Sequence, residues 1–377
     1  MNNDELKIGL ALSGGGNRAA VFHLGVLKWL AEKELLEKIS TISSVSGASI
    51  AIGLIYSIND YRWSTSKEYI EKVLPGIRKL MTTKDLQTGA IIRLILKPWN
   101  WNHRANILAE TIFKDWGVTG AIDQLPEYPA WKISTTTFET GKNWRISQKK
   151  MGDYIFGYSL KPNIPIAVAM AASAGYPVLI GPYALKTTKY EWLKYGKDNE
   201  LSVKAEPIFK KVHLWDGGVY ENLGVEALFK QDKLHHDINF LLVSDASGSV
   251  DIEKRSVIKP DKKLKRLILI AIDQIRSVRA RQVMSFFTRN PGNGLYIKIG
   301  NSAKYIVEQG GLADDKAQKL ISTCMEYKSV LRVRNYPTDL KKLTEENFDL
   351  ILRHGYETMY CTYETYEVKP SNCIVTK

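Results

Sequence analysis

The chain has 377 residues, of which 44% are hydrophobic and 25% are charged. This composition excludes a disordered chain and allows one large α/β domain or two smaller ones. The formal net charge of +13 favours an anionic partner, such as nucleic acid, anionic lipid or an acidic ligand, without choosing among them. Much of the excess is local, because residues 254–289 contain eleven Lys or Arg and only two Asp.

Targeting and membrane-spanning signals are weak. The chain begins with two acidic residues ahead of a short apolar run, which is a poor match to a signal peptide. No stretch reaches the ~18 uninterrupted apolar residues of a spanning helix. Cys324, Cys361 and Cys373 are odd in number and match no metal-binding spacing. We therefore expect a cytoplasmic protein with reduced thiols and at most peripheral membrane contact.

The first sixty residues alternate between strand and helix patterns. Lys7–Leu12 is an apolar strand, and the turn Ser13–Arg18 follows it. Apolar residues then recur at helical spacing over Ala19–Leu36. Ile39–Val45 is a second strand-like run, and the small residues of Ala48–Tyr56 form a helical pattern. This repetition predicts an α/β fold with a parallel sheet and helical crossovers.

The remaining chain continues the pattern after one interruption. Residues 59–129 are rich in Trp and Lys and lack strand signals, so we expect a mostly helical insertion. Strand character returns at Trp131–Phe138, with a hairpin partner within residues 143–147. The later expected elements are helices at Ile164–Ala174, Lys262–Phe287 and Glu345–Tyr366 and strands at Lys211–Trp215 and Ile238–Ser244. No linker is visible, so a single domain over residues 1–377 is favoured.

A glycine cluster, Gly14, Gly15 and Gly16, lies between the first strand and the first helix. Backbone N–H groups at such a junction form an anion site. One use is dinucleotide binding, but the second strand lacks the acidic residue that holds the ribose. A second use is an oxyanion hole, with Arg18 adding positive charge. A tight turn that only packs helix on strand is the third interpretation.

The segment "SSVSGAS" (Ser43–Ser49) is the best place for a nucleophile. A serine at the apex of a strand-to-helix turn needs small residues two positions before and after it. Ser46 alone meets this condition outside the helix, with Ser44 before it, Ala48 after it and Gly47 next to it. An ordinary polar turn is the alternative interpretation.

A serine nucleophile also needs a base. None of the six histidines has a convincing setting for a Ser-His-Asp triad. Asp216 has a suitable setting, because it follows the strand Lys211–Trp215 at the edge where α/β sheets build their sites. Gly217 and Gly218 allow close backbone approach, so the carboxylate could take the proton of Ser46 directly. Seen alone, Asp216 could equally be a turn residue.

Three motifs together resemble the patatin-like phospholipase family: "SGGGNRAAVFHLGVL" (Ser13–Leu27), "SSVSGAS" (Ser43–Ser49) and "WDGGVYENLGV" (Trp215–Val225). "AMAASAGYPVLIGP" (Ala169–Pro182) adds to the likeness, and elements further along are similar to those of a bacterial subgroup. Ser44 and Ala48 stand where the family often has glycine. The resemblance implies a three-layer α/β fold with a mainly parallel central sheet flanked by helices, with residues 59–129 as a variable insertion.

The resemblance also implies a function and a site. Ser46 is similar to the family's nucleophile, Asp216 to its general base, and Gly14, Gly15, Gly16 and Arg18 to its oxyanion loop, while Gly47, Gly217 and Gly218 support the site. The expected activity is hydrolysis of acyl esters in phospholipids or related lipids, without a cofactor or metal. Alternatives are an effector enzyme that awaits a regulatory ligand or partner, and a non-catalytic module that binds an anionic ligand.

Two further segments bear on membrane contact. Ile91–Arg104, "IIRLILKPWNWNHR", mixes aliphatic, Trp and basic residues, which suits a lipid headgroup interface, although a cap helix packed over the core is equally consistent. Arg276, Arg279 and Arg281 lie on the long basic helix, where a solvated face, anionic lipid or a regulatory nucleotide could explain them. We expect peripheral contact with an anionic membrane and no nucleic acid partner.

Overall fold

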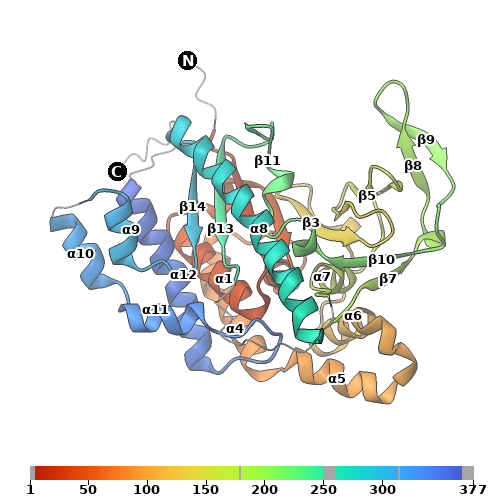
Figure 1. Ribbon diagram of the computed structural model, residues 1–377, viewed down its shortest axis with the longest axis horizontal. Coiled ribbons are helices and arrows are strands. Elements are labelled where there is room, and N and C mark those ends of the chain that lie inside the picture. The colour runs from red at the N-terminus through yellow and green to blue at the C-terminus, as the bar shows by residue number, and fades with distance from the viewer. Residues whose placement is uncertain (1–4, 178–179, 249–259, 313–314, 367–377) are drawn as a thin grey trace.

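The computed structural model describes residues 5–177, 180–248, 260–312 and 315–366. A twisted mixed sheet of twelve strands runs through this part of the chain (Figure 1). Its central strands pair in parallel in the order β14 (Gly294–Lys298), β13 (Phe240–Asp245), β1 (Ile8–Leu12), β2 (Ile39–Val45) and β3 (Ala130–Thr137). The predicted α/β class and parallel central sheet are therefore confirmed.

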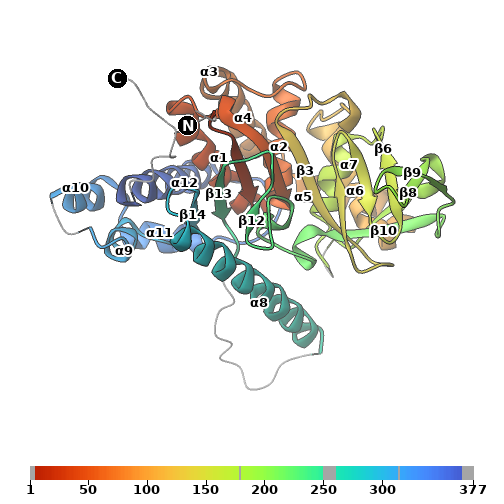
Figure 2. The same ribbon diagram turned by 90° about the horizontal axis from the view of Figure 1, so that it is seen from above.

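Both faces of the central strands are buried, which explains their almost unbroken apolar sequences. Alternate residues of β1 and β13, such as Leu10 and Leu242, belong to the main core beneath α1 (Gly16–Glu32) and α2 (Gly47–Ile58). Their neighbours Ala11 and Leu241 belong to a second core that includes Val283 and Phe286 of α8 (Pro260–Arg289). Figure 2 shows α8 on the opposite side of the sheet from α1 and α2.

Beyond β3 the sheet becomes antiparallel and twists away from the parallel half. The order continues through β4 (Asn143–Ile146), β5 (Lys150–Asp153), β6 (Gly157–Leu160), β8 (Trp192–Tyr195) and β9 (Leu201–Ala205). The hairpin partner predicted within residues 143–147 is β4. Separately, β10 (Lys211–Asp216) pairs antiparallel with both β3 and β7 (Tyr183–Lys186). A small hairpin, β11 (Phe229–Lys230) and β12 (Lys233–Leu234), stands apart from the sheet.

Residues 59–129 contain helices and no strand, as expected from their sequence. The longer helices of this segment are α4 (Leu74–Thr83), α5 (Leu86–Leu96) and α6 (Arg104–Asp115), and α3 (Ser66–Glu68) is a single turn that leads toward α4. The helices of the remaining chain are α7 (Ile166–Ser173), α9 (Ala303–Gln309), α10 (Asp315–Thr323), α11 (Tyr327–Arg334) and α12 (Glu345–Tyr366). Among these, α12 packs along α1 and covers it on the outer side.

The arginines predicted on a basic face of α8 have specific acidic partners. Arg276 is largely buried and donates to the buried Asp245 at 2.8 Å and to Asp273 at 2.7 Å. Arg279 donates to Glu226 at 2.5 Å. A solvated basic face is therefore wrong for these two residues, although Arg281 is exposed. The basic residues at 254–259 lie outside the described residues.

Candidate active site

The nucleophile turn joins β2 directly to α2. Ser46 has φ = 54° and ψ = −119°, a conformation that a non-glycine residue adopts only under constraint. The turn is tight enough that a Cβ atom on Gly47 would lie 2.0 Å from the carbonyl oxygen of Gly16. The local sequence therefore folds as expected for an apex serine, with its side chain partly exposed at the carboxyl end of a buried strand.

A chain of buried hydroxyl groups holds this turn in place. The Oγ atom of Ser173, on α7, accepts from the backbone N–H of Ser46 at 2.9 Å and donates to the carbonyl of Ser134 at 2.9 Å. Ser49 contacts Ser173 at 2.8 Å and Ser44 at 2.8 Å, and the indole of Trp131 donates to Ser44 at 2.8 Å. Because Ser173 gives its only hydrogen to Ser134, Ser49 must donate to Ser173 and Ser44 must donate to Ser49.

Asp216 lies at the end of β10, which follows β2 along the same edge of β3, so that the Asp216–Thr135 pair comes next to the Val45–Ser134 pair. Its Oδ1 atom accepts from the N–H of Gly218 at 2.7 Å, and the Ser46 hydroxyl lies near enough to favour the charged carboxylate as a second hydrogen-bond donor. The side chain is buried, and this desolvation raises the pKa of Asp216 from 3.8 to about 6, against the two hydrogen bonds that lower it. The group is therefore ionised at neutral pH and poised to take a proton.

The glycine loop lies beside the same serine. A Cβ atom on Gly14 would come within 3.0 Å of the Cβ atom of Ser46, so only glycine permits this approach. The N–H of Gly14 donates to the carbonyl of Asn222 at 3.1 Å. Gly15 and Gly16 have φ of 149° and 63°, values that favour glycine, and α1 begins at Gly16. The positive end of α1 therefore faces the serine turn.

Arg18 is buried and anchored on one side. Its Nη1 atom donates to the carbonyl oxygens of Arg334 at 3.2 Å and Tyr336 at 2.8 Å. Its Nε and Nη2 atoms are buried without a hydrogen-bond partner among the described residues. Burial lowers the pKa of Arg18 to about 10, so the guanidinium remains charged at neutral pH. Arg18 lines the same cavity as the glycine loop.

The serine, the aspartate and the glycine loop share one cavity of about 620 Å³. This size suits an acyl chain or another small ligand. Gly218 of the aspartate turn lies in the same lining. Much of the wall is aliphatic, with side chains from α5, α6 and α8: Ile91, Leu94, Ile107, Leu108, Leu269 and Ile272.

The histidines do not contribute to the described wall of this cavity. His23 is fully buried between the Oγ atom of Ser244 and the carbonyl of Ser13, and burial lowers its pKa to about 4. His213 pairs with Glu139 at 2.6 Å.

Sequence reasoning missed two residues that position the site. Ser173 supports the backbone of Ser46, and Asn222 accepts from Gly14 and donates to Ser247 at 2.9 Å. Both lie inside motifs that the sequence marks, at Ala169–Pro182 and Trp215–Val225, but their contacts cross between distant segments. Gly217 was expected to support the site, and a Cβ atom there would lie 2.3 Å from the carbonyl of Ser134 on β3.

Comparison with known proteins identifies the family. The family model for patatin-like phospholipase matches residues 10–229, more than half of the chain, and this range contains the serine turn, the aspartate turn and the glycine loop. The chain belongs to the patatin-like phospholipase family.

Curated relatives carry the same domain within much longer chains. A patatin-like phospholipase domain-containing protein of Chaetomium globosum is 24% identical over 259 residues, which cover 64% of this chain and 25% of that protein. A protein of the same description from Pyricularia oryzae is 23% identical over 257 residues, covering 64% of this chain and 27% of that protein. This patatin-like chain therefore spans about a quarter of the length of the curated relatives it matches.

A solved structure shares the fold. The human GIVD cytosolic phospholipase A2 aligns with 97% of this patatin-like chain and 63% of its own chain, with a TM-score of 0.53 and 13% sequence identity. At this identity the likeness concerns the fold alone. It agrees with the three-layer arrangement that the sequence led us to expect.

Proposed function

We propose that this protein is a lipid acyl hydrolase of the phospholipase A type, which cleaves carboxylic esters of phospholipids or related lipids. The observation that supports it best is the placement of the Ser46 side chain next to the buried Asp216 carboxylate, within one largely aliphatic cavity of about 620 Å³. Membership of the patatin-like phospholipase family supports the same chemistry.

In the proposed reaction, the Oγ atom of Ser46 attacks the ester carbonyl carbon while Asp216 takes the hydroxyl proton. The carbonyl oxygen becomes an oxyanion, and N–H groups at Gly15 and Gly16 are the proposed donors. The N–H of Gly14 already donates to the carbonyl of Asn222, so Gly14 is not a proposed donor to the oxyanion. Its role is to leave room next to Ser46. Arg18 adds positive charge beside the loop. These steps use only groups of this chain and require no metal or cofactor.

The proposed reaction is completed in three proton transfers. As the C–O bond of the ester breaks, the leaving alkoxide accepts the proton held by Asp216 and departs as an alcohol. A water molecule then attacks the acyl-Ser46 carbonyl, Asp216 takes a proton from it, and the fatty acid leaves as the serine regains its hydroxyl hydrogen.

The substrate would reach the cavity past an apolar rim. Six side chains at the end of α5 and in the turn after it are strongly exposed: Ile91, Ile92, Ile95, Leu96, Trp99 and Trp101. Leu264 and Leu267 on α8 are also exposed, and α8 contributes Leu269 to the cavity wall. An exposed apolar surface beside a lipid-sized cavity supports peripheral docking on a bilayer.

The docking we propose depends on apolar contact more than on charge. The basic side chains of this segment are engaged within the fold, since Arg93 pairs with Asp115 at 2.6 Å and Lys97 pairs with Glu110 at 2.7 Å. Among the described residues, no helix has both the length and the apolarity to span a bilayer. A cytoplasmic location stays a prediction.

Release of fatty acid from mixed phospholipid vesicles in the presence of EDTA tests the proposal. We expect activity in the wild type and its loss, by a factor of at least ~10³, in Ser46→Ala and Asp216→Ala. Labelling of the wild type by a fluorophosphonate should be lost in Ser46→Ala. Equal activity in all three proteins would contradict the assigned site. Absence of both activity and labelling in the wild type would instead favour a module that binds an anionic ligand.

A further inference from the structure

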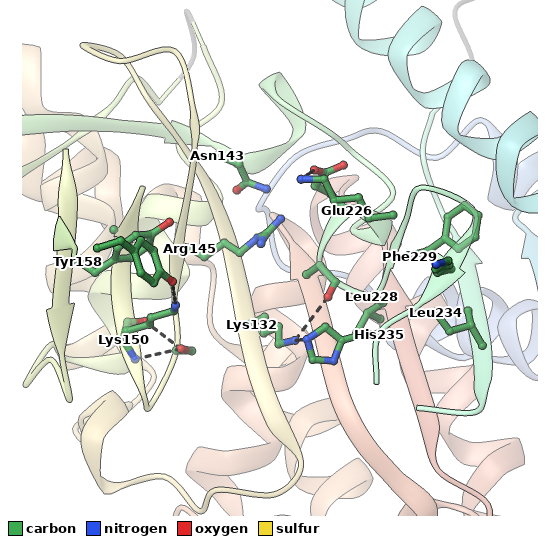
Figure 3. Close-up of a pocket in the computed structure, with 16 residues that line it drawn as sticks. Lys132, Asn143, Arg145, Lys150, Tyr158, Glu226, Leu228, Phe229, Leu234 and His235 are labelled. Atoms are coloured by element: carbon green, nitrogen blue, oxygen red, sulfur yellow. Dashed lines mark hydrogen bonds and ion pairs between the residues drawn. The ribbon is translucent and has the colours of Figure 1, made fainter. Parts of the chain in front are cut away.

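A second cavity, of about 450 Å³, lies apart from Ser46 and has no lining residue in common with the first. One wall is the antiparallel part of the sheet, from β3 to β6, and the other is the segment from Glu226 to His235, which includes the β11–β12 hairpin. Figure 3 shows Lys132 and Arg145 on the sheet side, with Glu226 and His235 across from them. Its size is typical of a site for a small molecule.

The lining of this cavity is strongly basic. It contains one acidic side chain and five basic ones: Lys132, Arg145, Lys150, Lys230 and Lys233. The acidic residue, Glu226, already binds Arg279 at 2.5 Å and Lys230 at 3.4 Å. Its charge is therefore neutralised by partners at the edge of the cavity and on α8, and the interior of the cavity keeps a positive surplus.

Two of the basic side chains form no direct ion pair with a described residue. Arg145 forms no ion pair with a described residue, and its Nε atom is buried without a hydrogen-bond partner among them. The Nζ atom of Lys132 has only long contacts, at 3.4 Å to the carbonyl of Ala227 and at 3.4 Å to the ring of His235. Burial, together with the charge of Arg145, lowers the pKa of Lys132 to about 8, although the nearby carboxylate of Asp237 acts in the opposite direction. A bound anion would relieve both the repulsion and the missing hydrogen bonds.

A third basic group is held in position by aromatic rings. The Nζ atom of Lys150 donates to the hydroxyl of Tyr195 at 3.0 Å and lies 4.7 Å from the centre of the Tyr158 ring. Both tyrosines line the cavity. Because its oxygen accepts from Lys150, the Tyr195 hydroxyl can still donate its own hydrogen to a ligand. The wall thus combines fixed cations with hydroxyl donors, the groups that bind phosphate oxygens.

We infer that this cavity is a binding site for a small, multiply charged phosphate-bearing anion, with Arg145 and Lys132 as the principal contacts. The anion could be a free phosphorylated molecule or the phosphorylated headgroup of a lipid, which present the same chemistry. This site is separate from the proposed catalytic site and does not depend on it.

The two sites are joined through β3. Lys132, Ser134 and Thr136 lie on the same side of this strand, because side chains alternate along it. Ser134 supports Ser173, and the Oγ1 atom of Thr136 donates to the carbonyl of Asp216 at 2.9 Å. The segment that begins at Asp216 also ends in the second cavity, at Ala227 and His235. A ligand there contacts both chain segments that hold the general base.

Calorimetric titration of the full chain with ATP and with inorganic pyrophosphate tests the site. We expect binding by the wild type and a loss of about tenfold or more in affinity for Arg145→Gln and for Lys132→Gln. Arg145→Lys, which keeps the charge, should retain more affinity than Arg145→Gln. Lys204→Gln, an exposed lysine of β9 outside the cavity, is the matched control and should bind as the wild type does. Thermal melts of each variant without ligand establish that it is folded.

Two further experiments show whether the anion is a free molecule or a lipid headgroup, and in which of the two cavities it binds. Binding to phosphatidylcholine vesicles is compared with and without phosphatidylinositol monophosphate, and a gain that is absent in Arg145→Gln would identify a lipid headgroup. If Ser46→Ala binds ATP and pyrophosphate with the affinity of the wild type, the ligand is not bound against Ser46 in the catalytic cavity. This conclusion does not depend on the result of the activity assay. The inference is overturned if the wild type binds none of these probes, or if folded Arg145→Gln and Lys132→Gln bind as the wild type does.

Discussion

Gly47 and Gly16 touch backbone to backbone, so that a Cβ atom on Gly47 would lie 2.0 Å from the Gly16 carbonyl oxygen. This contact fixes the serine turn against the glycine loop. We expect Gly47→Ala to destabilise the protein by about 3 kcal/mol or more, since neither backbone can retreat without moving a strand or a helix. The free energy of unfolding in urea measures this loss.

The control for that substitution is Gly141→Ala. Unlike Gly47, Gly141 has a positive φ, of 64°, and nothing lies within 4 Å of its Cβ position. Backbone strain alone should cost about 1–2 kcal/mol there. An equal loss at the two positions would show that the contact with Gly16 is not responsible.

Asp216 should set the acid limit of activity. With a pKa of about 6, the carboxylate becomes protonated as the pH falls below that value, and ester hydrolysis should fall with it. The pH dependence of kcat/KM on a soluble ester measures the midpoint. A rate that stays constant down to pH 4 would exclude Asp216 as the base.

The raised pKa of Asp216 also predicts that the folded protein becomes more stable when the negative charge of this side chain is removed. Because folding raises the pKa of Asp216 from 3.8 to about 6, its favourable contribution is fully present below pH 3.8 and is lost as the pH rises through 6. At pH 8 the buried charge costs about 3 kcal/mol at most. Asp216→Asn should therefore be inactive yet melt at a higher temperature than the wild type at pH 8, and the difference should shrink toward pH 5.

Ser44 stands where the family often has glycine, but here its hydroxyl is needed. It accepts from the indole of Trp131 and donates to Ser49. Ser44→Gly and Ser44→Ala should each destabilise the protein by about 2 kcal/mol, because buried polar groups lose their partners. Ser43→Ala is the matched control, since the Oγ atom of Ser43 is buried without a partner among the described residues. Denaturant unfolding would contradict the assignment if Ser43→Ala cost as much.

Arg276 and Arg281 lie on the same helix but should differ in their effect on stability. Among the described residues, Arg276→Ala leaves the buried carboxylate of Asp245 with the hydroxyl of Tyr296, at 2.6 Å, and the N–H of Ser247, at 3.0 Å, but with no hydrogen bond to a cation. We expect a loss of about 3–5 kcal/mol. Exposed Arg281→Ala should change the unfolding free energy by less than about 0.5 kcal/mol. If both substitutions changed the unfolding free energy by similarly small amounts, Arg276 would behave as part of a solvated basic face of α8.

The exposed tryptophans provide a test of membrane docking. Trp99 and Trp101 are 74% and 62% exposed. Replacing both with Ala should weaken binding to phospholipid vesicles by about tenfold or more, because each buries a large apolar ring in the interface. Hydrolysis of a short soluble ester should be unchanged. Tyr305→Ala, an exposed aromatic residue on α9, is the control for vesicle flotation. Equal loss of vesicle binding and ester hydrolysis would contradict docking.

The sequence was most informative where local pattern and tertiary structure agree. The strand, turn and helix at Lys7–Tyr56 appear as expected, and the structure brings Ser46 and Asp216 together as the motifs suggested. The first helix begins at Gly16, three residues before its apolar pattern starts, because the glycine loop itself makes its first turn.

The antiparallel half of the sheet was predicted only in part. Strands β5, β6 and β8 are four residues long. Each is too short to show the alternation of apolar and polar residues by which a strand is recognised in a sequence. The second cavity could not be predicted either. Lys132, Arg145 and Lys150 come from separate strands, and only the pairing of β3, β4 and β5 places them on one wall, with His235 on the wall opposite.

The pairing of β2 and β10 with one edge of β3 has a consequence for how the chain folds. β2, which carries Ser46, lies parallel to β3, whereas β10, which carries Asp216, pairs antiparallel with it on another part of its length. The two side chains are distant along the chain and meet only after a long loop has closed and β10 has docked, a step opposed by chain entropy. A nascent chain that ends before Lys211 holds the serine without its carboxylate. The pairing of serine and aspartate is therefore absent from every shorter intermediate of synthesis.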